Sequence, residues 1–190
     1  MIFTALFLFF MMVMSIQRIW ETFFKSFEKE KGTIVSGWTL FSLSSVHFTV
    51  GILTALEYFI IKRHINFIIT GIGFIFFLFS FVLRKRSMKI LGKYHSVHIE
   101  IRKNHRLIQN DLYGYMRHPY YLSVITELLA FPLIPNAYYS FCFSLFFYLP
   151  LVLIRVYLEE KAMIEKFGEE YLLYKRSVRA FLPLRRLKAN

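Results

Sequence analysis

Residues 117–121 read Arg-His-Pro-Tyr-Tyr and stand where a polar, basic stretch changes into two apolar segments. After these segments the chain becomes polar again at Arg155, Glu159 and Glu160. Arginine, histidine and tyrosine are costly at the mouth of a membrane helix unless they are paired or functional. We therefore expect residues 117–121 and the turn that carries Arg155 and Glu159 to close over one cofactor at a membrane surface.

The composition indicates an integral membrane protein. Of the 190 residues, 56% are hydrophobic and 23 are phenylalanine, which is more apolar surface than a soluble domain of this size could bury. The net charge of +12 would suit nucleic acid, but the basic residues lie between apolar segments, where the positive-inside rule accounts for them. We therefore expect no nucleic-acid partner. The single Cys142 excludes a disulfide framework and a cysteine metal cluster.

Five apolar segments predict a helical membrane protein with about five transmembrane helices. Their bounds are 2–17, with Trp20 as an interface anchor, 38–61, 65–83, 120–135 and 138–157. Gly71 and Gly73 are expected to let the third helix pack closely against a neighbour. The last two segments form a hairpin whose first arm is short, and Pro150 is expected to kink the second arm near Arg155.

The polar connections give weaker signals. Glu21 and Lys25, four residues apart in the charged stretch 21–32, favour a short solvated helix. The long connection 84–118 contains four histidines whose spacing matches no zinc pattern, so we predict no metal site. Within it, residues 95–101 alternate in the manner of an extended segment.

The distribution of basic residues predicts the orientation of the chain. Residues 18–31, 84–117 and 155–188 hold 22 of the 24 Lys and Arg residues, and five crossings bring these three groups to one side. The positive-inside rule then predicts an N-terminus outside and a C-terminus in the cytosol. The Arg117 and Arg155 regions would share the cytosolic face, and the basic C-terminal tail would contact anionic membrane lipids.

His47 and Glu57 are polar residues inside the second apolar segment. Ten residues separate them, which is about 15 Å along a helix, and we expect them to share a face. One interpretation is a polar lining of a substrate cavity. The other, which we favour, is hydrogen bonding between helices.

Arg155 and Glu159 lie four residues apart and so share one face of a helix. They could form a structural ion pair that anchors the end of the helix. They could also supply a cation and an anion to a pocket beside Tyr113, Tyr120 and Tyr121. Aromatic faces and a carboxylate suit a sulfonium or another cationic ligand, and an arginine suits a carboxylate or phosphate group. The residues alone therefore predict a membrane enzyme or carrier with a cytosol-facing polar pocket.

The C-terminal half resembles the isoprenylcysteine carboxyl methyltransferase family, and the N-terminal half is similar to small bacterial members of it. The resemblance covers about residues 92–184. Its motifs are His105-Arg-Leu-Ile, Tyr113, Arg117-His118-Pro119-Tyr120-Tyr121, Arg155-x-x-x-Glu159-Glu160, Phe167-Gly168-Glu169-Glu170-Tyr171-x-x-Tyr174 and Pro183.

This resemblance implies a cofactor, S-adenosylmethionine, that is bound without a Rossmann domain. Arg155 and Glu159 would face the substrate. Asp111 stands where the family usually has glycine, and His98 and Tyr120 also depart from the usual residue types. The residues expected to line the cofactor pocket are His98, His105, Arg106, Leu107, Ile108, Tyr113, His118, Pro119, Tyr120 and Tyr121. Residues 1–83 would form a membrane region of three spans and 84–190 the catalytic region, within one integrated domain.

The implied activity is O-methylation of a lipophilic acceptor. That acceptor would be the carboxylate of a prenylcysteine-like substrate or the hydroxyl of a small lipid such as an alkylpyrone. A carboxylate needs no base, whereas a phenol or enol would need Glu159 or His118 to accept its proton. Two alternatives stay open: a non-enzymatic lipid-binding membrane protein, and an NADPH-dependent membrane enzyme similar to sterol reductases.

Overall fold

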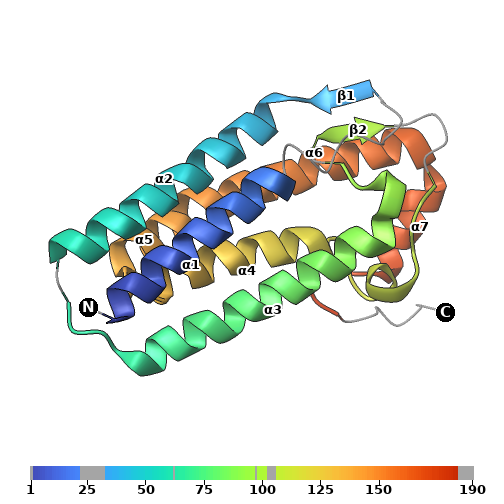
Figure 1. Ribbon diagram of the computed structural model, residues 1–190. Coiled ribbons are helices and arrows are strands. Elements are labelled where there is room, and N and C mark those ends of the chain that lie inside the picture. Colours follow the sequence, from blue (N-terminus) through green and yellow to red (C-terminus); the bar gives the residue numbers. More distant parts are fainter. Residues whose placement is uncertain (1, 22–32, 62, 97, 102–105, 184–190) are drawn as a thin grey trace.

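Long helices run alternately from one end of a bundle to the other in the computed structural model, which describes residues 2–21, 33–61, 63–96, 98–101 and 106–183 (Figure 1). The α-helices are α1 Ile2–Ile19, α2 Trp38–Ile61, α3 Phe67–Leu91, α4 Pro119–Leu133, α5 Tyr138–Phe143, α6 Leu149–Phe167 and α7 Glu169–Ser177. A π-helical segment, η4 Ser144–Tyr148, joins α5 to α6, and the short 3-10 helices are η2 Gly92–Tyr94 and η3 Asp111–Gly114.

The prediction of a helical membrane fold is confirmed. Among the described residues, four helical stretches are long and apolar enough to cross a membrane: Ile2–Ile19, Trp38–Ile61, Phe67–Tyr94 and Tyr138–Phe167. The first arm of the predicted hairpin is α4, whose 15 residues fall short of the roughly 20 of a full span, as its sequence predicted. α3 continues past the predicted end at Leu83 to Leu91, so it crosses the boundary that we placed between residues 83 and 84.

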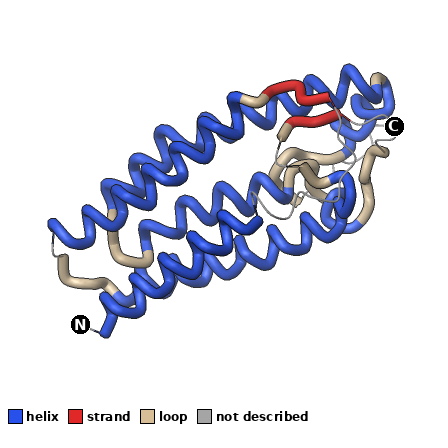
Figure 2. The backbone as a smooth tube through the Cα atoms, turned by 45° about the horizontal axis from the view of Figure 1, so that its top comes forward, coloured by secondary structure: helices blue, strands red, loops and turns tan. Residues whose placement is uncertain are grey.

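Described basic residues such as Arg117, Lys175 and Arg176 stand at one end of the bundle. The two strands and α7 lie there, together with most of the irregular backbone (Figures 1 and 2). The N-terminus, the α2–α3 connection and the α4–α5 connection lie at the opposite end (Figure 1). Helices α1, α3 and α6 thus all run toward the end of the bundle that holds the two strands and α7 (Figure 1).

α3 and α4 form the most extensive helix pair, and they approach each other closely at Gly73. A Cβ atom at Gly73 would stand 3.0 Å from Leu133 Cβ and 3.1 Å from Ala130 O. At Gly71 a Cβ atom would meet nothing within 4 Å. Gly73 alone of the two therefore supports the predicted close packing.

Two apolar clusters hold the bundle together. One joins α2, α4, η4 and α6 through Val50, Val124, Leu128, Tyr148 and Val152. The other joins α1 to α3 and α4, largely through phenylalanine rings such as Phe10 and Phe77, whose centroids are 4.9 Å apart. Phe7 is the single buried residue of α1, and the other side chains of α1 that contact this cluster are only partly buried.

Glu57 fixes the end of the bundle that contains the N-terminus. Its carboxylate accepts hydrogen bonds from Arg63 Nη1 at 2.8 Å and from the backbone N–H groups of Tyr139 at 3.1 Å and Ser140 at 2.8 Å. It therefore connects α2 to the start of α5. For Glu57, hydrogen bonding between helices, the favoured interpretation, is confirmed.

A two-stranded antiparallel ribbon connects the two halves of the chain. β1 Thr33–Ser36 precedes α2, and it pairs with β2 Ile99–Ile101 in the register Thr33↔Ile101, Ile34↔Glu100 and Ser36↔Ile99, with an irregularity between Ile34 and Ser36. The extended segment predicted over residues 95–101 is thus confirmed at β2. The solvated helix predicted over residues 21–32 lies outside the described residues except for Glu21.

The second arm of the hairpin is irregular just before Pro150. η4 is π-helical, and Pro150 stands in the first turn of α6, where its missing N–H is tolerated. At the other end of α6, Gly168 has φ +55° and lets the chain turn directly into α7. This turn brings α7 back toward residues 116–118.

Candidate active site

The segment before α4 is fixed to the C-terminal part of the chain. Backbone N–H groups of Arg117 and His118 donate to the carbonyls of Arg179 and Ala180, each at 2.9 Å. Pro119 is the first residue of α4 and is buried, a position where the fixed φ of proline favours the start of a helix. His118 is thereby held at the mouth of α4, as the sequence predicted.

An apolar cavity of about 360 Å³ lies between the helices. Side chains at helical spacing line it on three sides: Met11, Met14, Ser15, Arg18 and Ile19 from α1; Leu40, Leu43, Ser44, His47, Phe48, Gly51, Ile52 and Ala55 from α2; Tyr120, Tyr121, Val124, Glu127, Leu128 and Phe131 from α4. From Leu40 to Ala55 the cavity follows α2 for about 22 Å. His47 belongs to this lining and Glu57 does not, so the two residues do not share the predicted face.

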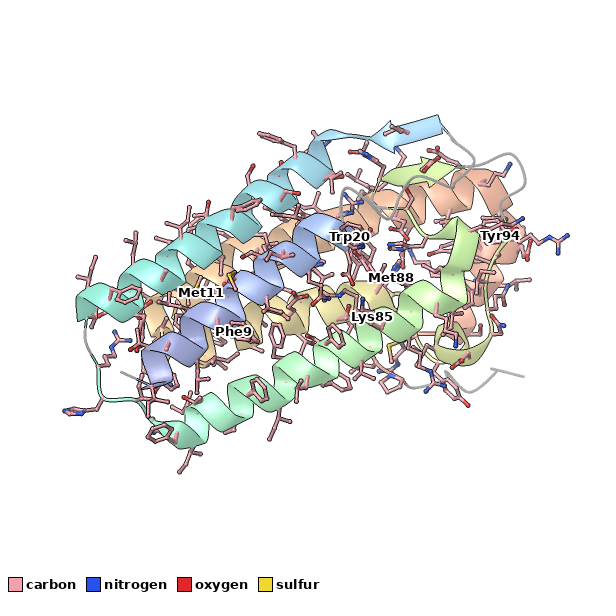
Figure 3. All side chains as sticks on the ribbon, in the orientation of Figure 1. Phe9, Met11, Trp20, Lys85, Met88 and Tyr94 are labelled. Atoms are coloured by element: carbon pink, nitrogen blue, oxygen red, sulfur yellow. The ribbon has the colours of Figure 1, made fainter. Side chains whose placement is uncertain are left out.

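A smaller cavity of about 100 Å³ lies on the other side of the α4 N-terminus. The predicted cofactor residues His98, Arg106, Leu107, Ile108, Tyr113, His118, Tyr120 and Tyr121 line it, together with Glu159, Met163, Tyr171 and Tyr174. Pro119 is not in the lining, because it serves the start of the helix. His105 lies outside the described residues. Figure 3 shows Tyr94, which also lines this cavity, at the same end of the bundle as α7.

Ser96, Tyr120 and Tyr121 line both cavities and form the wall between them. The Tyr121 hydroxyl crosses this wall: it donates to the Glu159 carboxylate in the smaller cavity and accepts from Arg155 Nε, in the larger one, at 2.9 Å. Arg155 is 4% exposed. The Tyr121 hydroxyl therefore joins Arg155 to Glu159. Neither the spacing of the charged residues nor the helical periodicity of the sequence predicted this connection.

Thr39 is a further residue of the site that the sequence did not indicate. Its hydroxyl accepts a hydrogen bond from Arg155 Nη1 at 2.8 Å, across 116 positions of sequence. Thr39 stands in the first turn of α2, directly after β1, and is 2% exposed. The N-terminal half of the chain therefore helps to orient the arginine of the C-terminal half.

Glu160 centres an ion cluster beneath the smaller cavity. It lies 3.0 Å from His118 Nε2, 2.6 Å from Arg117 Nη2 and 2.7 Å from Lys175 Nζ. Arg117 also donates to the backbone carbonyls of Val178 and Lys175. This cluster fixes the orientation of the His118 ring and connects α4, α6 and α7. The sequence placed Glu160 in a motif but gave it no function.

Three buried tyrosines on the loop and α7 remain neutral at physiological pH. Burial, and then the charge of Glu159, raises the pKa of Tyr113. Burial and Glu160 likewise raise the pKa of Tyr171. Burial is also the main cause of the raised pKa of Tyr174, whose hydroxyl donates to the Tyr113 carbonyl at 2.6 Å. The wall of the smaller cavity thus offers neutral aromatic faces next to the carboxylates of Glu100 and Glu159.

Asp111 explains a departure from the family pattern. Its φ is +51°, in the left-handed region where glycine is favoured and where aspartate is among the better-tolerated alternatives. It begins η3, the turn that presents Tyr113 to the smaller cavity, and its carboxylate contacts Arg86 at 3.2 Å. The turn expected of glycine is therefore made by aspartate.

The fold and the site define a class: a helical membrane protein in which a small cavity with charged and aromatic side chains shares wall residues with a larger apolar cavity between the helices. Comparison with known proteins agrees with this class. The sequence model of the isoprenylcysteine carboxyl methyltransferase (ICMT) family matches residues 72–165, a segment that includes His118, Tyr121, Arg155 and Glu159. The chain belongs to this family.

Two curated relatives and one solved structure are similar to the chain. A protein-S-isoprenylcysteine O-methyltransferase of Xenopus laevis is 36% identical over 59% of the chain and 40% of its own length. A methanethiol S-methyltransferase of Bradyrhizobium diazoefficiens is 35% identical over 40% of the chain and 25% of its own length. The eukaryotic intramembrane Ras methyltransferase ICMT shares the fold, with a TM-score of 0.55 and 20% identity over 78% of the chain and 50% of that structure. The chain thus spans about half or less of these three proteins.

Proposed function

We propose that this chain is a membrane methyltransferase that methylates a lipophilic acceptor with S-adenosylmethionine. The observation that carries the proposal is the wall of Ser96, Tyr120 and Tyr121, whose side chains line both the smaller cavity, with its charged and aromatic residues, and the apolar cavity. The names of the relatives, one an O-methyltransferase and one an S-methyltransferase, support methyl transfer as the reaction.

The residues of the smaller cavity fit the proposed cofactor. Tyrosine faces and the Glu159 carboxylate suit a sulfonium cation. His98 Nδ1 is buried without a hydrogen-bond partner in the described part of the chain, so it is available to a polar group of the ligand. The enclosed volume of about 100 Å³ is below the roughly 300 Å³ of small ligand sites, so the cofactor would extend beyond it. When bound, S-adenosylmethionine supplies a methyl group that is displaced in line from sulfur to the acceptor, leaving a neutral thioether.

Arg155 is the residue that we assign to the reacting end of the acceptor. It lines the apolar cavity directly beside the shared wall, and Thr39 and Tyr121 orient its guanidinium. An acceptor carboxylate would bind to Arg155 and would need no base. An acceptor hydroxyl would pass its proton to Glu159, with Tyr121 as the connecting hydroxyl. We assign this function to Glu159 and not to His118, because the described polar contact of His118 Nε2 is with Glu160.

The apolar cavity supports a lipid as the acceptor. Its volume is within the range of small-molecule sites, and its length along α2 is about two thirds of the roughly 30 Å hydrocarbon core of a bilayer. α1 and α2 both line it, and both expose large apolar side chains to the membrane, among them Phe9 and Phe48. We infer that the acceptor reaches the cavity from the bilayer and that the basic end of the bundle faces the cytosol.

Titration of the detergent-solubilised chain with S-adenosylmethionine by calorimetry tests the proposal. We expect binding of S-adenosylmethionine and none of NADPH; the opposite result would reject methyl transfer in favour of a nicotinamide-dependent reaction. Lipid mass spectrometry of cells with and without the chain should then reveal an acceptor that differs by one methyl group. Binding of neither cofactor would indicate a lipid-binding protein without this activity.

A further inference from the structure

A charged site lies deep in the apolar cavity, well below the wall where the reaction is proposed. Arg18 of α1, His47 of α2 and Glu127 of α4 all line the cavity there. Charged groups at membrane depth are costly unless they are paired, and when they face a cavity they usually bind something. No step of the proposed reaction uses these three residues.

Part of this group has a structural explanation. Glu127 binds Arg84 of α3, and Arg84 also lies 3.3 Å from Glu21 just after α1, so these residues tie three helices together. Arg84 is 2% exposed and does not line the cavity. Figure 3 shows Lys85, which also binds Glu21, on α3 at the level of Trp20. The connection between helices is therefore complete without Arg18 and His47.

Arg18 has bonding capacity that the protein does not use. Its Nη2 donates to Glu127 at 2.6 Å, which holds the guanidinium in place. Its Nε is buried and has no hydrogen-bond partner among the described residues. An orphaned N–H group of this kind destabilises the fold unless a ligand or solvent oxygen accepts from it.

His47 faces the same space. Within the described ranges its imidazole makes no hydrogen bond, and Arg18 and Glu127 are among the charges that act on it. Neighbouring residues at helical spacing on α2, Leu43, Phe48 and Gly51, line the cavity as well, so the ring stands in an otherwise apolar wall. A neutral imidazole donates a hydrogen bond from one ring nitrogen and accepts one at the other.

The distance from this site to the reacting end follows from helix geometry. Along α2, eight residues separate His47 from Thr39, the partner of Arg155, which is about 12 Å. Along α4, six residues separate Glu127 from Tyr121, which is about 9 Å. Both helices thus give a distance of roughly 10 Å between this charged site and the reacting end of the acceptor.

We propose that Arg18 and His47 bind a second oxygen of the acceptor lipid, a hydroxyl or carbonyl group about 10 Å from the atom that receives the methyl group. The position of the reacting atom rests on the proposed function; the binding of the second oxygen does not. A buried site built to hydrogen-bond an oxygen discriminates strongly against an analogue that lacks it, because its polar groups are then left unpaired. Arg18 and His47 would therefore determine which lipids are accepted.

Binding of three lipid probes to the full chain in nanodiscs tests this inference without any methyl transfer. The probes are octadecanoate and two of its monohydroxy derivatives, one with the hydroxyl at the middle of the chain and one with it at the terminal carbon. We expect the mid-chain hydroxyl to tighten binding about tenfold over octadecanoate, which corresponds to roughly 1.4 kcal/mol. The terminal hydroxyl should give no such gain.

The variant His47→Leu should reduce the mid-chain preference to less than about twofold while the affinity for octadecanoate stays the same. Phe48→Leu, one position along in the same wall, should keep the preference. Arg18→Lys, which retains the ion pair but lacks the Nε–H group, should also lose it. Equal affinities for the three probes, or a preference that survives His47→Leu, would show that water alone satisfies these groups and would overturn the inference. Failure of S-adenosylmethionine binding would leave these lipid measurements unchanged, so the two proposals fail separately.

Discussion

Arg155 Nε lies 2.9 Å from the hydroxyl oxygen of Tyr121, and this hydrogen bond crosses the wall between the two cavities. The same hydroxyl donates to Glu159, so one phenol connects the guanidinium on the apolar side to the carboxylate on the polar side. Neither charge is in open water. The connection accounts for how a cation and an anion can both persist at the boundary of a membrane.

Tyr121→Phe should separate the two charges while keeping the ring. We expect kcat/KM for methyl transfer to fall about 10- to 100-fold, because a hydrogen bond to a charged group contributes roughly 1.5–3 kcal/mol. Transfer of a radiolabelled methyl group to extracted lipid measures this change. Tyr157→Phe on α6, where the ring is 68% exposed, is the matched control and should retain full activity. Unchanged turnover in Tyr121→Phe would remove the phenol from the site.

Glu159→Gln and Glu160→Gln should separate function from stability at neighbouring positions. Glu160 pairs with Arg117 and Lys175 and contacts His118, so its loss leaves the buried Arg117 guanidinium without its carboxylate and should destabilise the fold by about 3–5 kcal/mol. Glu159→Gln should abolish most methyl transfer and leave the unfolding temperature nearly unchanged. Thermal unfolding in detergent, followed by fluorescence, and turnover are measured on both variants. The reverse pattern would exchange the two assignments.

Gly73→Ala should weaken the α3–α4 interface. The added Cβ would stand 3.0–3.1 Å from Leu133 Cβ and from backbone atoms of Ala130 and Ile134, none of which can turn aside. We expect a loss of about 1–3 kcal/mol, or roughly 2–10 °C in Tm. Gly71→Ala, where a Cβ meets nothing within 4 Å, is the control and should be neutral. Equal Tm values for the two variants would contradict the packing described.

Cysteine labelling should reveal the orientation of the chain. Starting from Cys142→Ser, the variants His64→Cys and Arg176→Cys place one thiol at each end of the bundle on exposed positions. A membrane-impermeant maleimide added to intact cells should label position 64 and should reach position 176 after lysis. This pattern follows from the positive-inside rule. Labelling of position 176 in intact cells would invert the proposed topology.

Stability should fall at alkaline pH. Burial raises the pKa of Tyr113 and Tyr171 above the ordinary value of about 10, so the unfolded chain loses these protons first as pH rises. The contribution to stability is complete below pH of about 10 and declines above it. Unfolding temperatures measured from neutral to alkaline pH test this. Tyr113→Phe should flatten the decline, whereas Tyr115→Phe, 58% exposed, should not.

The spans could be predicted from the sequence because hydropathy alone decides them. α2 begins and ends at the predicted residues, Trp38 and Ile61, since polar or charged residues flank the apolar run on both sides. α3 runs eight residues further than predicted because Arg84 is buried against Glu127, 43 positions away. A local sequence pattern contains no information about such a partner.

The candidate site was predicted in its parts and not in its connections. The family motifs identified Tyr121, Arg155 and Glu159, and the structure brings them together. The contribution of Thr39 and the ion cluster of Glu160 were missed, because their partners come from distant elements. His47 was identified as polar at membrane depth, but which face of the helix it occupies depends on how α1, α2 and α4 enclose the cavity.

The wall of Ser96, Tyr120 and Tyr121 has a consequence for kinetics. The concentration of the donor that the enzyme experiences would be an amount per volume of cytosol, whereas that of the acceptor would be an amount per area of bilayer. Diluting the acceptor with inert phospholipid at constant bulk concentration should therefore slow turnover, whereas adding buffer that contains the donor at the same concentration should not. The methylated product would return to the leaflet from which its precursor came, so its removal would depend on how fast it diffuses or is consumed within that leaflet.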